Sequence, residues 1–528
     1  MCPDEAETEP SIRTRNPLLE GILNGELPSG SSIALIGAPG TGTSMMATQY
    51  AINALAKGKK IIFGLLDYVP QLAYKYFNIL GFDAQPFLAD GRLQIIDEYE
   101  FLRKLMGIST LTDIANLRPL EFEEISKAFQ NGLMTRILNN ENETYTIVTD
   151  SMTSLSPFLD VHTMYEILAE NFDLMKKMNN STLTVAHEGV LESNFVQILT
   201  RFVDGVIRLK MHRSARGITR EIYVEKMRLT NVETPSADFT ISDRGISLNY
   251  EDSQTSVETS RKVQRPQASR TKSLQLPKEE RTPIGIPALD TILGGGLPRG
   301  TFICIEGDVG TGTSTLCTQF AWSRLLAGGR VAYYCIDEPP DTVINQFLSF
   351  GWDIKPYLEG RRIVVSDAYN LFRAGRLAAL KGTKDFAGIR KLVGEFMKME
   401  DAKLGSSDAP LVAVIDSFTT MAPYLDLKTA YVLARIVADN ARMSEETYLA
   451  VVHSGTVEAN LLYACLGTAD GIIKLESNWT RRKSDSQDRR RLVRKMIIDK
   501  MAFTSAPSYP IEYEINSKGI QLVSGDDS

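Results

Sequence analysis

The sequence predicts an α/β protein made of two copies of one domain, each with a mostly parallel β-sheet flanked by helices and an antiparallel hairpin at the sheet edge. The two halves of the chain align with each other along almost their whole length. In each half, short apolar runs alternate with helix-length segments, which is typical of parallel strands joined by crossover helices. Near the end of each half, longer strands of alternating polarity follow one another, as in an antiparallel hairpin.

The internal repeat defines the domains. An offset of 270 residues places Gly37 on Gly307, and after a small change in length an offset of 266 places Asp150 on Asp416. Near the two ends the offset is 274. Residues 250–279, between the two copies, contain no apolar period and are rich in Ser, Thr, Gln, Lys and Arg, so we expect them to form a flexible linker. The predicted segments are a tail (1–11), a first domain (12–249), the linker (250–279), a second domain (280–524) and a second tail (525–528).

The predicted strands follow in chain order. Each copy begins with an apolar run before a glycine-rich loop, and two further apolar runs come later, each bounded by polar residues. These runs are 33–36, 61–66 and 146–149 in the first copy, and 302–305, 331–336 and 411–415 in the second. The hairpins are predicted at 205–223 and 471–498.

The glycine-rich loops are the clearest candidates for a binding site. Residues 37–44 read Gly-Ala-Pro-Gly-Thr-Gly-Thr-Ser, and residues 307–314 read Gly-Asp-Val-Gly-Thr-Gly-Thr-Ser. A loop between a strand and a helix offers successive backbone N–H groups to a phosphate. The usual pattern has a lysine where Thr43 and Thr313 stand. The predicted nucleotide-binding residues are Gly37, Gly40, Thr41, Gly42, Thr43, Ser44, Gly307, Gly310, Thr311, Gly312, Thr313 and Ser314.

An aspartate ends a later strand in each copy, at the same sheet edge as the loop. Asp150 and Asp416 could there hold Mg²⁺ through water, while Ser44 and Ser314 bind the metal directly. The alternative is that each aspartate caps the following turn. The order of loop and acid occurs twice, which favours the metal site.

A second acidic residue is predicted to end the strand after the loop helix. Asp67 and Asp337 are candidates to activate an attacking water, and Glu338 gives the second copy a pair of carboxylates. The first copy has Tyr68 in place of this partner. The alternative for Asp-Glu-Pro-Pro is a turn after a strand. His187 and His453 also end a strand in each copy, either as polar strand ends or as sensors of a γ-phosphate.

A basic pair near the end of the first domain is a candidate to act on a neighbouring site. Lys226 and Arg228 follow a predicted strand, and Lys500 and Ala502 are their counterparts. In ring-forming ATPases a Lys-x-Arg segment can reach a neighbour's γ-phosphate. A charged edge strand is the other interpretation.

Charge, cysteine content and hydropathy indicate which partners and which cell compartment to expect. The net charge of −7 gives no overall reason to expect nucleic acid, although a basic cluster at 481–495 is either a solvated loop or a site for nucleic acid or an acidic partner. Five cysteines without paired spacing predict reduced thiols and a cytoplasmic protein. No apolar run approaches the roughly 20 residues that span a membrane, and the acidic N-terminus does not resemble a signal peptide.

Taken with the Gly-Thr-Gly-Thr-Ser loops and Asp337-Glu338-Pro339-Pro340, residues 282–300 make the chain resemble KaiC and its archaeal and bacterial relatives in the RecA superfamily. This resemblance implies tandem RecA-like P-loop domains, ATP and Mg²⁺ bound between subunits, and a hexameric ring. Clock proteins of this family phosphorylate an adjacent Ser-Thr pair before the position of Asp470, but residues 464–469 contain no such pair. Autokinase activity is therefore not expected.

The resemblance and the missing lysines together predict a nucleotide-dependent scaffold or signalling protein, largely inactive as an ATPase, with a protein partner that the sequence does not name. Two alternatives stay open. The chain could be a working ATPase in which another cation, such as Lys226 from a neighbour, replaces the lysine. It could also be a RecA-type DNA-associated protein that uses the cluster at 481–495.

Overall fold

A computed structural model describes most of both predicted domains. The described residues are 17–98, 100, 143–158, 161–189, 194–214, 217–228, 236–242, 245–249, 281–368, 404, 409–421, 427–454, 459–481, 490–504, 507 and 509–523. We call the described residues up to 249 domain 1 and those from 281 domain 2. The predicted tails and linker lie outside the described residues, as do residues 482–489 of the basic cluster.

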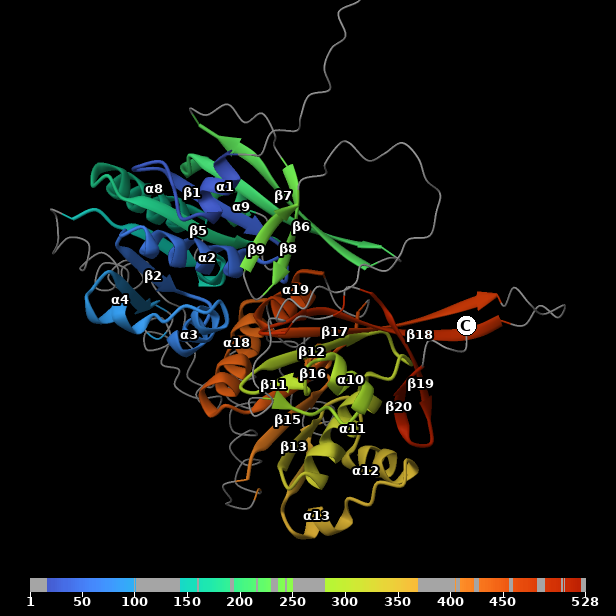
Figure 1. Ribbon diagram of the computed structural model, residues 1–528. Coiled ribbons are helices and arrows are strands. Elements are labelled where there is room, and N and C mark those ends of the chain that lie inside the picture. Colours follow the sequence, from blue (N-terminus) through green and yellow to red (C-terminus); the bar gives the residue numbers. More distant parts are fainter. Residues whose placement is uncertain are drawn as a thin grey trace, which may run out of the picture.

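Helices lie between most successive strands of domain 1 up to β6, and the last four strands follow one another (Figure 1). In chain order they are α1 (Pro17–Leu23), β1 (Ser32–Gly37), α2 (Thr43–Ala56), β2 (Ile61–Leu65), α3 (Pro70–Ile79), α4 (Gln85–Ala89), β3 (Leu93–Asp97), β4 (Thr146–Asp150), the 3₁₀ helix η3 (Met152–Phe158), α8 (Val161–Lys177), β5 (Ser181–His187), α9 (Asn194–Phe202), β6 (Gly205–Ser214), β7 (Gly217–Met227), β8 (Ser236–Ser242) and β9 (Gly245–Asn249).

Domain 2 repeats this order. Its elements are β10 (Arg281–Thr282), α10 (Pro287–Ile292), β11 (Leu297–Pro298), β12 (Phe302–Gly307), α11 (Thr313–Leu326), β13 (Arg330–Cys335), α12 (Pro340–Ser349), α13 (Lys355–Glu359), β14 (Ile363–Asp367), β15 (Leu411–Asp416), α17 (Phe418–Met421), α18 (Leu427–Ser444), β16 (Thr447–Val452), α19 (Ala459–Thr468), β17 (Gly471–Arg481), β18 (Arg490–Met501), β19 (Ile511–Asn516) and β20 (Gly519–Leu522).

The described part of each domain contains one nine-stranded sheet. The order is β3-β2-β4-β5-β1-β6-β7-β8-β9 in domain 1 and β14-β13-β15-β16-β12-β17-β18-β19-β20 in domain 2. In the first sheet, the neighbouring strands β3, β2, β4, β5, β1 and β6 run parallel to one another. Strands β6, β7, β8 and β9 then pair antiparallel. This confirms the predicted α/β class and the antiparallel edge. The edge is longer than the predicted hairpin because two further strands extend it in each domain.

Alternate residues of the central strands pack against opposite layers of helices. In β1, Ile33 and Leu35 pack with α2, whereas Ala34 and Ile36 pack in the cluster that contains α8 and α9 residues. Every residue of β1 is buried, as expected for a parallel strand covered on both faces. The chain ends of the parallel strands, where the loops lie, are therefore held in place by two apolar layers.

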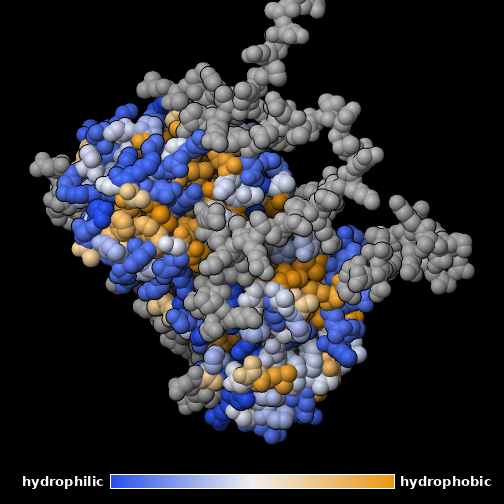
Figure 2. Space-filling model, viewed as in Figure 1, coloured by the Kyte–Doolittle hydropathy of each residue, from blue (hydrophilic) through white to orange (hydrophobic). Residues whose placement is uncertain are grey.

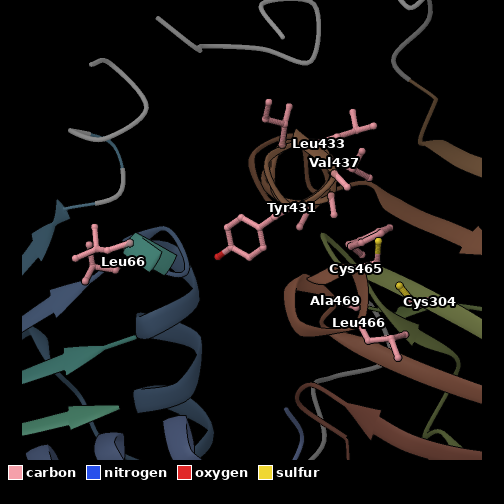
Figure 3. Packing of buried hydrophobic residues seen from close by; sticks show 14 of the residues in the cluster. Leu66, Cys304, Tyr431, Leu433, Val437, Cys465, Leu466 and Ala469 are labelled. Atoms are coloured by element: carbon pink, nitrogen blue, oxygen red, sulfur yellow. The ribbon is translucent and has the colours of Figure 1, made fainter. Parts of the chain in front are cut away.

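The two domains share one continuous apolar cluster. Leu66, Met152 and Leu155 of domain 1 belong to the same buried cluster as Tyr431 and Ala434 of α18. Figure 3 shows Tyr431 projecting from α18 toward the side on which Leu66 lies. The Tyr431 hydroxyl is 2.8 Å from Ser154 Oγ in η3. Domain 2 therefore packs on the sheet edge of domain 1 where the predicted site lies.

Phe503 makes a second contact between the domains. This residue of domain 2 lies in the core cluster of domain 1, with its ring centre 5.0 Å from that of Tyr76. Buried Arg281 holds its backbone, because the guanidinium donates to the Phe503 carbonyl oxygen at 2.8 Å and to Thr504 Oγ1 at 2.7 Å. Domain 2 thus contacts domain 1 with a helix and with a loop that follows β18.

The surface, the helix lengths and the thiols bear on the class of protein. On the face that Figure 2 shows, hydrophilic residues make up much of the coloured surface, with hydrophobic patches among them. No helix in the described part of the chain is both long enough and apolar enough to cross a membrane. The cysteines of domain 2 are free and buried, namely Cys304, Cys317, Cys335 and Cys465.

Candidate functional site

Each glycine-rich loop joins the end of a buried strand to the start of a 14-residue helix, α2 or α11. Gly42 and Gly312 precede these helices with φ angles of 110° and 100°, which lie in the left-handed region that favours glycine. Neither helix has a side-chain cap. The backbone N–H groups of the first turn are therefore the natural donors for an anion. We call the surroundings of loop 37–44 site 1 and those of loop 307–314 site 2.

Asp150 and Asp416 end β4 and β15, as predicted, and in both copies the next peptide bond is cis. Both carboxylates are buried. Burial raises the pKa of Asp150 to about 7 and that of Asp416 to about 6. Ser314 Oγ donates to Asp416 Oδ1 at 3.3 Å, which brings the loop serine and the strand-end carboxylate together.

This donor set fits Mg²⁺. The metal prefers oxygen ligands, keeps several waters, and is usually bound by one or two carboxylates together with phosphate oxygens. One hydroxyl and one carboxylate per site meet that need. Among the described residues no group of three or more His, Cys, Asp or Glu side chains could hold a metal alone, so the nucleotide itself would have to supply ligands.

A tyrosine hydroxyl donates to each of these carboxylates, but from positions that are not equivalent. Tyr68 donates to Asp150 Oδ2 at 2.6 Å, and Tyr333 donates to Asp416 Oδ2 at 2.8 Å. Tyr68 follows β2, at the position that Glu338 occupies in domain 2, whereas Tyr333 lies within β13. Tyr68 therefore replaces the second carboxylate in site 1 and also donates a hydrogen bond to Asp150. Its counterpart in domain 2, Glu338, has an exposed side chain.

In site 1 a histidine contacts the threonine that replaces the lysine. His187 Nε2 is 3.3 Å from Thr43 Oγ1, and its Nδ1 is 3.2 Å from Ser151 Oγ. Ser151 donates to Asp67 Oδ2 at 2.5 Å, and His187 Nδ1 is 3.5 Å from the same carboxylate. Burial lowers the pKa of His187. The sequence offered His187 only as a strand end or a sensor, and the structure places it inside the site.

In site 2 the equivalent histidine makes different contacts. His453 Nε2 is 3.2 Å from Asp337 Oδ2, and its Nδ1 is 3.2 Å from the Gly307 carbonyl oxygen. Because both partners are acceptors, the geometry fits a ring protonated on both nitrogens. The hydrogen bond to Asp337 raises the pKa of His453. Burial opposes ionisation of Asp337, but hydrogen bonds from His453, Thr420 and Ser417 outweigh it and lower its pKa.

Site 1 lies in a cleft between the two domains. Loop residues Thr43 and Ser44 line it from domain 1, and Arg435, Arg442 and Lys500 line it from domain 2. The cleft volume is about 210 Å³, below the range of about 300–1,000 Å³ that is typical of ligand pockets. The space at site 1 is therefore small for a nucleotide in this arrangement of the domains.

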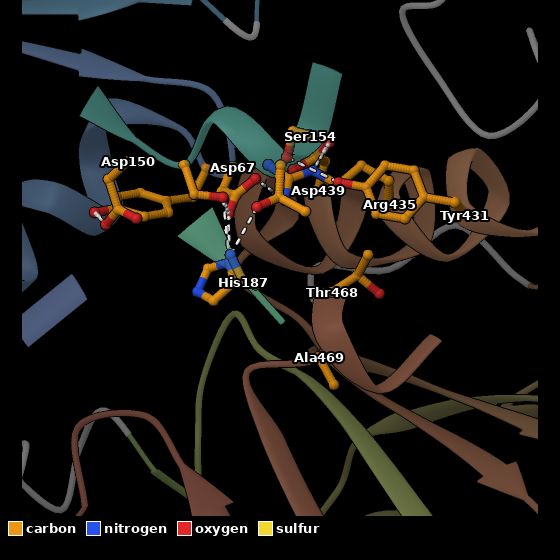
Figure 4. A network of polar contacts seen from close by, with 12 residues as sticks. Asp67, Asp150, Ser154, His187, Tyr431, Arg435, Asp439, Thr468 and Ala469 are labelled. Carbon is orange, nitrogen blue, oxygen red and sulfur yellow. Dashed lines mark hydrogen bonds and ion pairs between the residues drawn. The ribbon is translucent and has the colours of Figure 1, made fainter. Parts of the chain in front are cut away.

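Three cations of domain 2 approach site 1. Arg435 Nη1 is 3.8 Å from Asp67 Oδ1, and Arg442 Nη1 is 3.4 Å from the Asp67 carbonyl oxygen. Figure 4 shows Asp67 and His187 of domain 1 beside Arg435 and Tyr431 of domain 2. Lys500 lies against the loop, since its Cβ is 3.4 Å from the place that a Cβ on Gly40 would occupy. Its Nζ donates to the Ala469 carbonyl oxygen at 2.5 Å, and burial lowers its pKa.

The predicted basic pair of domain 1, Lys226 and Arg228, does not reach site 1. Lys226 is on β7 itself, not after the strand as predicted, and its Nζ donates to the Thr200 and Val203 carbonyl oxygens of its own domain. Arg228 contacts Asp204 at 3.4 Å and is exposed. Neither residue lines the cleft at site 1. The structure thus brings Lys500 to site 1 and leaves Lys226 and Arg228 on the surface of domain 1.

Sequence reasoning missed Arg435 and Arg442. They lie in the middle and last turn of α18, where no motif marks them. A weak signal exists, because Arg435 and Asp439 are four residues apart in a helix whose other residues are largely apolar, and both are buried. Asp67 and Asp337 were expected at strand ends, but each lies two residues beyond its strand.

The fold and the two loops define a class of nucleotide-binding α/β proteins with tandem RecA-like domains. A family model described as "ATPase: KaiC" matches residues 12–253 and 282–527. The chain therefore belongs to the KaiC family of ATPases.

Curated relatives resemble one domain or more. A UPF0273 protein of Aeropyrum pernix is 30% identical over 245 residues, which cover 46% of this chain and 92% of that protein. A UPF0273 protein of Pyrococcus horikoshii is 29% identical over 244 residues, with the same coverage. The circadian clock protein KaiC2 of Synechocystis is 24% identical over 347 residues, which cover 64% of this chain and 55% of that protein.

Proposed function

We propose that this chain binds ATP with Mg²⁺ at both sites and hydrolyses it slowly or not at all, and that it acts as a nucleotide-dependent assembly in signalling or regulation. The observation that carries this proposal is the threonine at the lysine position of both loops. A charge-assisted hydrogen bond contributes roughly 1.5–3 kcal/mol, so its loss weakens binding about ten- to a hundredfold. Hydrolysis loses more, because the cation also stabilises charge in the transition state.

The proposed roles follow the geometry of each site. The loop backbones bind phosphates, Ser44 with Asp150 and Ser314 with Asp416 hold the metal, and Asp67 or Asp337 with Glu338 would orient the attacking water. Asp337 already accepts hydrogen bonds from three side chains and has a lowered pKa, which makes it a weak proton acceptor. Asp67 is similarly engaged by Ser151 and lies 3.8 Å from Arg435. These contacts support slow turnover.

We further propose a cytoplasmic homo-oligomer that works through a protein partner. Free buried cysteines support a reducing compartment. The narrow cleft at site 1 supports a role for nucleotide in changing the spacing of the two domains. The family implies a hexameric ring, and each chain carries two family domains. If the two domains of a chain were neighbours in such a ring, three chains would supply its six domains.

An active ATPase with a substitute cation is the second candidate. The observation that favours it is the position of Arg435, Arg442 and Lys500 in the cleft at site 1. A nucleotide between the domains would bring its phosphates near these side chains. In this case the substitute cation at site 1 comes from domain 2 of the same chain instead of from Lys226 of a neighbour.

Steady-state ATP turnover and calorimetric binding of Mg-ATP distinguish the two candidates. We expect binding at both sites with little turnover. Asp337→Ala/Glu338→Ala should then change turnover little, as should the control Asp341→Ala/Glu359→Ala, which removes exposed carboxylates of the same domain. Robust hydrolysis would overturn the proposal: its loss in Asp67→Ala would establish an active site 1 with the substitute cations of domain 2, and its loss only in Asp337→Ala/Glu338→Ala would establish an active site 2.

A further inference from the structure

His187 lies beside both ends of loop 37–44. In the parallel pairing of β1 with β5, His187 is the partner of Gly37, the first residue of the loop. Its backbone N–H donates to Thr153 Oγ1 at 2.7 Å, which fixes this end of β5. The imidazole Nε2 is 3.3 Å from Oγ1 of Thr43, the first residue of α2. The ring is therefore held beside the residue that stands at the lysine position.

The hydrogen bonds around the His187 ring assign its protons. Ser151 Oγ donates its single proton to Asp67 Oδ2 at 2.5 Å, so it can only accept from His187 Nδ1, which is 3.2 Å away. In the neutral ring Nδ1 therefore carries the proton, and Nε2 accepts from the Thr43 hydroxyl. Figure 4 shows the His187 ring next to the Asp67 carboxylate. The nitrogen on the loop side is thus the one that can gain a proton.

Three charged groups act most strongly on the ring, and each comes from a different element. The carboxylate of Asp67, after β2, is 3.5 Å from Nδ1 and favours the protonated ring. Lys500 of β18 and Arg435 of α18 oppose protonation. The groups that contact the ring from α2 and from the segment after β4 are uncharged hydroxyls. Burial has the largest effect and lowers the pKa of His187, so the ring of the free protein is neutral at pH 7.

A nucleotide at site 1 would bring a negative charge to this ring. The phosphates of a bound nucleotide lie against the loop backbone, and the usual lysine at position 43 reaches the β- and γ-phosphates. The hydroxyl of Thr43 cannot supply that positive charge. A histidine that is oriented by a carboxylate can gain a proton when an anion comes close, because both negative charges stabilise the protonated ring. His187 belongs to domain 1, so it can act without the basic residues of domain 2.

We propose that protonated His187 replaces the missing lysine of site 1 as a phosphate-binding residue, and that Mg-ATP binding there is accompanied by the uptake of a proton at Nε2. This inference rests on the proposed function, which supplies the nucleotide. It applies to site 1 alone, because His453 Nε2 already has Asp337 as its partner and its Nδ1 has the Gly307 carbonyl oxygen. The two loops thus bind phosphates with different help from the strand-end histidines.

The affinity of site 1 for Mg-ATP should depend on pH. Phosphates raise the pKa of His187 in the bound state, so the contribution of this ring is full at low pH and is lost as the pH rises through the bound-state pKa. Asp150, with a pKa of about 7, has the opposite effect, because the metal needs its ionised form. The contribution of His187 is therefore the ratio of affinities between the unmodified chain and His187→Gln, which should fall about fivefold or more from pH 6.5 to pH 8.

Calorimetry of Mg-ATP binding at pH 7, in buffers of different ionisation enthalpy, measures the proton uptake directly. The unmodified chain should take up more protons than His187→Gln, by up to about one proton per chain. His162→Gln, which removes a histidine whose side chain is 83% exposed on α8, should show the same uptake as the unmodified chain. Equal uptake by the unmodified chain and His187→Gln would overturn the inference.

Thr43→Lys tests the replacement without altering His187. A lysine at this position supplies the cation itself and repels a second positive charge, so the uptake should fall to that of His187→Gln. Unchanged uptake in Thr43→Lys would also contradict the inference. Mg-ATP binding at site 1 without uptake that depends on His187 refutes this inference and leaves the proposed function standing. A chain that binds no Mg-ATP refutes the proposed function as well.

Discussion

Thr43 and Thr313 occupy equivalent positions, but their neighbours differ. His187 contacts Thr43, whereas His453 has turned to Asp337 and the Gly307 carbonyl oxygen. Burial lowers the pKa of His187, and the carboxylate of Asp337 raises that of His453. The pKa shifts of the two equivalent histidines therefore have opposite directions, although both loops end in Gly-Thr-Gly-Thr-Ser.

Restoring the lysine should strengthen nucleotide binding. Thr313→Lys supplies a cation that can form a charge-assisted hydrogen bond with a phosphate, and we expect Mg-ATP to bind site 2 about ten- to a hundredfold more tightly. Isothermal titration calorimetry measures the change. Thr313→Met, which adds length without charge, is the matched control. Equal effects of the two substitutions would contradict the electrostatic explanation.

The contact between His453 and Asp337 should depend on pH. Because the folded-state pKa of His453 lies above its ordinary value of 6.5, the contact stabilises the fold fully below that pH, and this contribution is lost as the pH rises through the folded-state pKa. Asp337 has a lowered pKa, so its contribution is present above its ordinary value of 3.8 and is lost as the pH falls through the folded-state pKa.

NMR titration of the imidazole signals can check this. Asp337→Asn should lower the pKa of His453, since it removes the hydrogen-bonded carboxylate. Asp67→Asn, the equivalent change in domain 1, should leave His453 unchanged. The chain has only four histidines, so the signals can be assigned by single substitutions. An unchanged His453 titration in Asp337→Asn would rule out the assigned contact.

Local patterns explain which site residues could be predicted. Gly42, Ser44 and Asp150 lie at strand ends and helix starts, where the sequence of one segment determines their place. Tyr333 could not be predicted as a partner of Asp416, because the two are 83 residues apart and the equivalent of Tyr333 in domain 1 is a phenylalanine. Arg435 reaches site 1 only because α18 packs on η3, and that packing leaves no local motif.

At the scale of elements, α18 serves both the core of domain 2 and the contact with domain 1. Ala434, Val437 and Ala441 lie in the shared apolar cluster, and Arg435 and Asp439 are buried as well. A helix buried on more than one side has few positions that tolerate change. Its counterpart α8 keeps a solvent-exposed side, which carries Tyr165 and an exposed pair of Asp173 and Lys177.

Replacing a tyrosine by alanine should therefore lower the free energy of unfolding more in α18 than in α8. Tyr431→Ala should lower the free energy of unfolding by roughly 3–5 kcal/mol, because it leaves a cavity in the shared cluster. Tyr165→Ala should cost about 1 kcal/mol or less in dilute protein. Urea denaturation measures both. Similar losses for the two tyrosines would contradict the described packing.

At the scale of the whole molecule, the apolar cluster that crosses between the domains should couple their unfolding. Calorimetry of the intact chain should show one transition. Tyr431→Ala/Phe503→Ala, which removes the contacts of domain 2 with Ser154 and Tyr76 of domain 1, should separate it into two. Two well-resolved transitions in the unmodified chain would show that the domains are energetically independent.

The fold class and repeat could be predicted from the sequence because apolar periodicity and equivalent residues extend over both copies. The relative position of the domains could not, because it depends on a few side chains, such as Phe503 against Tyr76, that are far apart in sequence. The contact nevertheless decides how site 1 is built, since three of its cations come from domain 2.

The two tyrosines that reach the strand-end carboxylates limit how either copy can change. In domain 1, Tyr68→Glu alone would restore the acid that domain 2 has, yet it would also remove the hydroxyl that donates to Asp150. Phe63→Tyr would first have to provide a replacement from inside β2, at the position of Tyr333. We therefore expect Tyr68→Glu alone to leave Asp150 without its tyrosine donor, and a residue taken from one copy to work in the other only together with its partner.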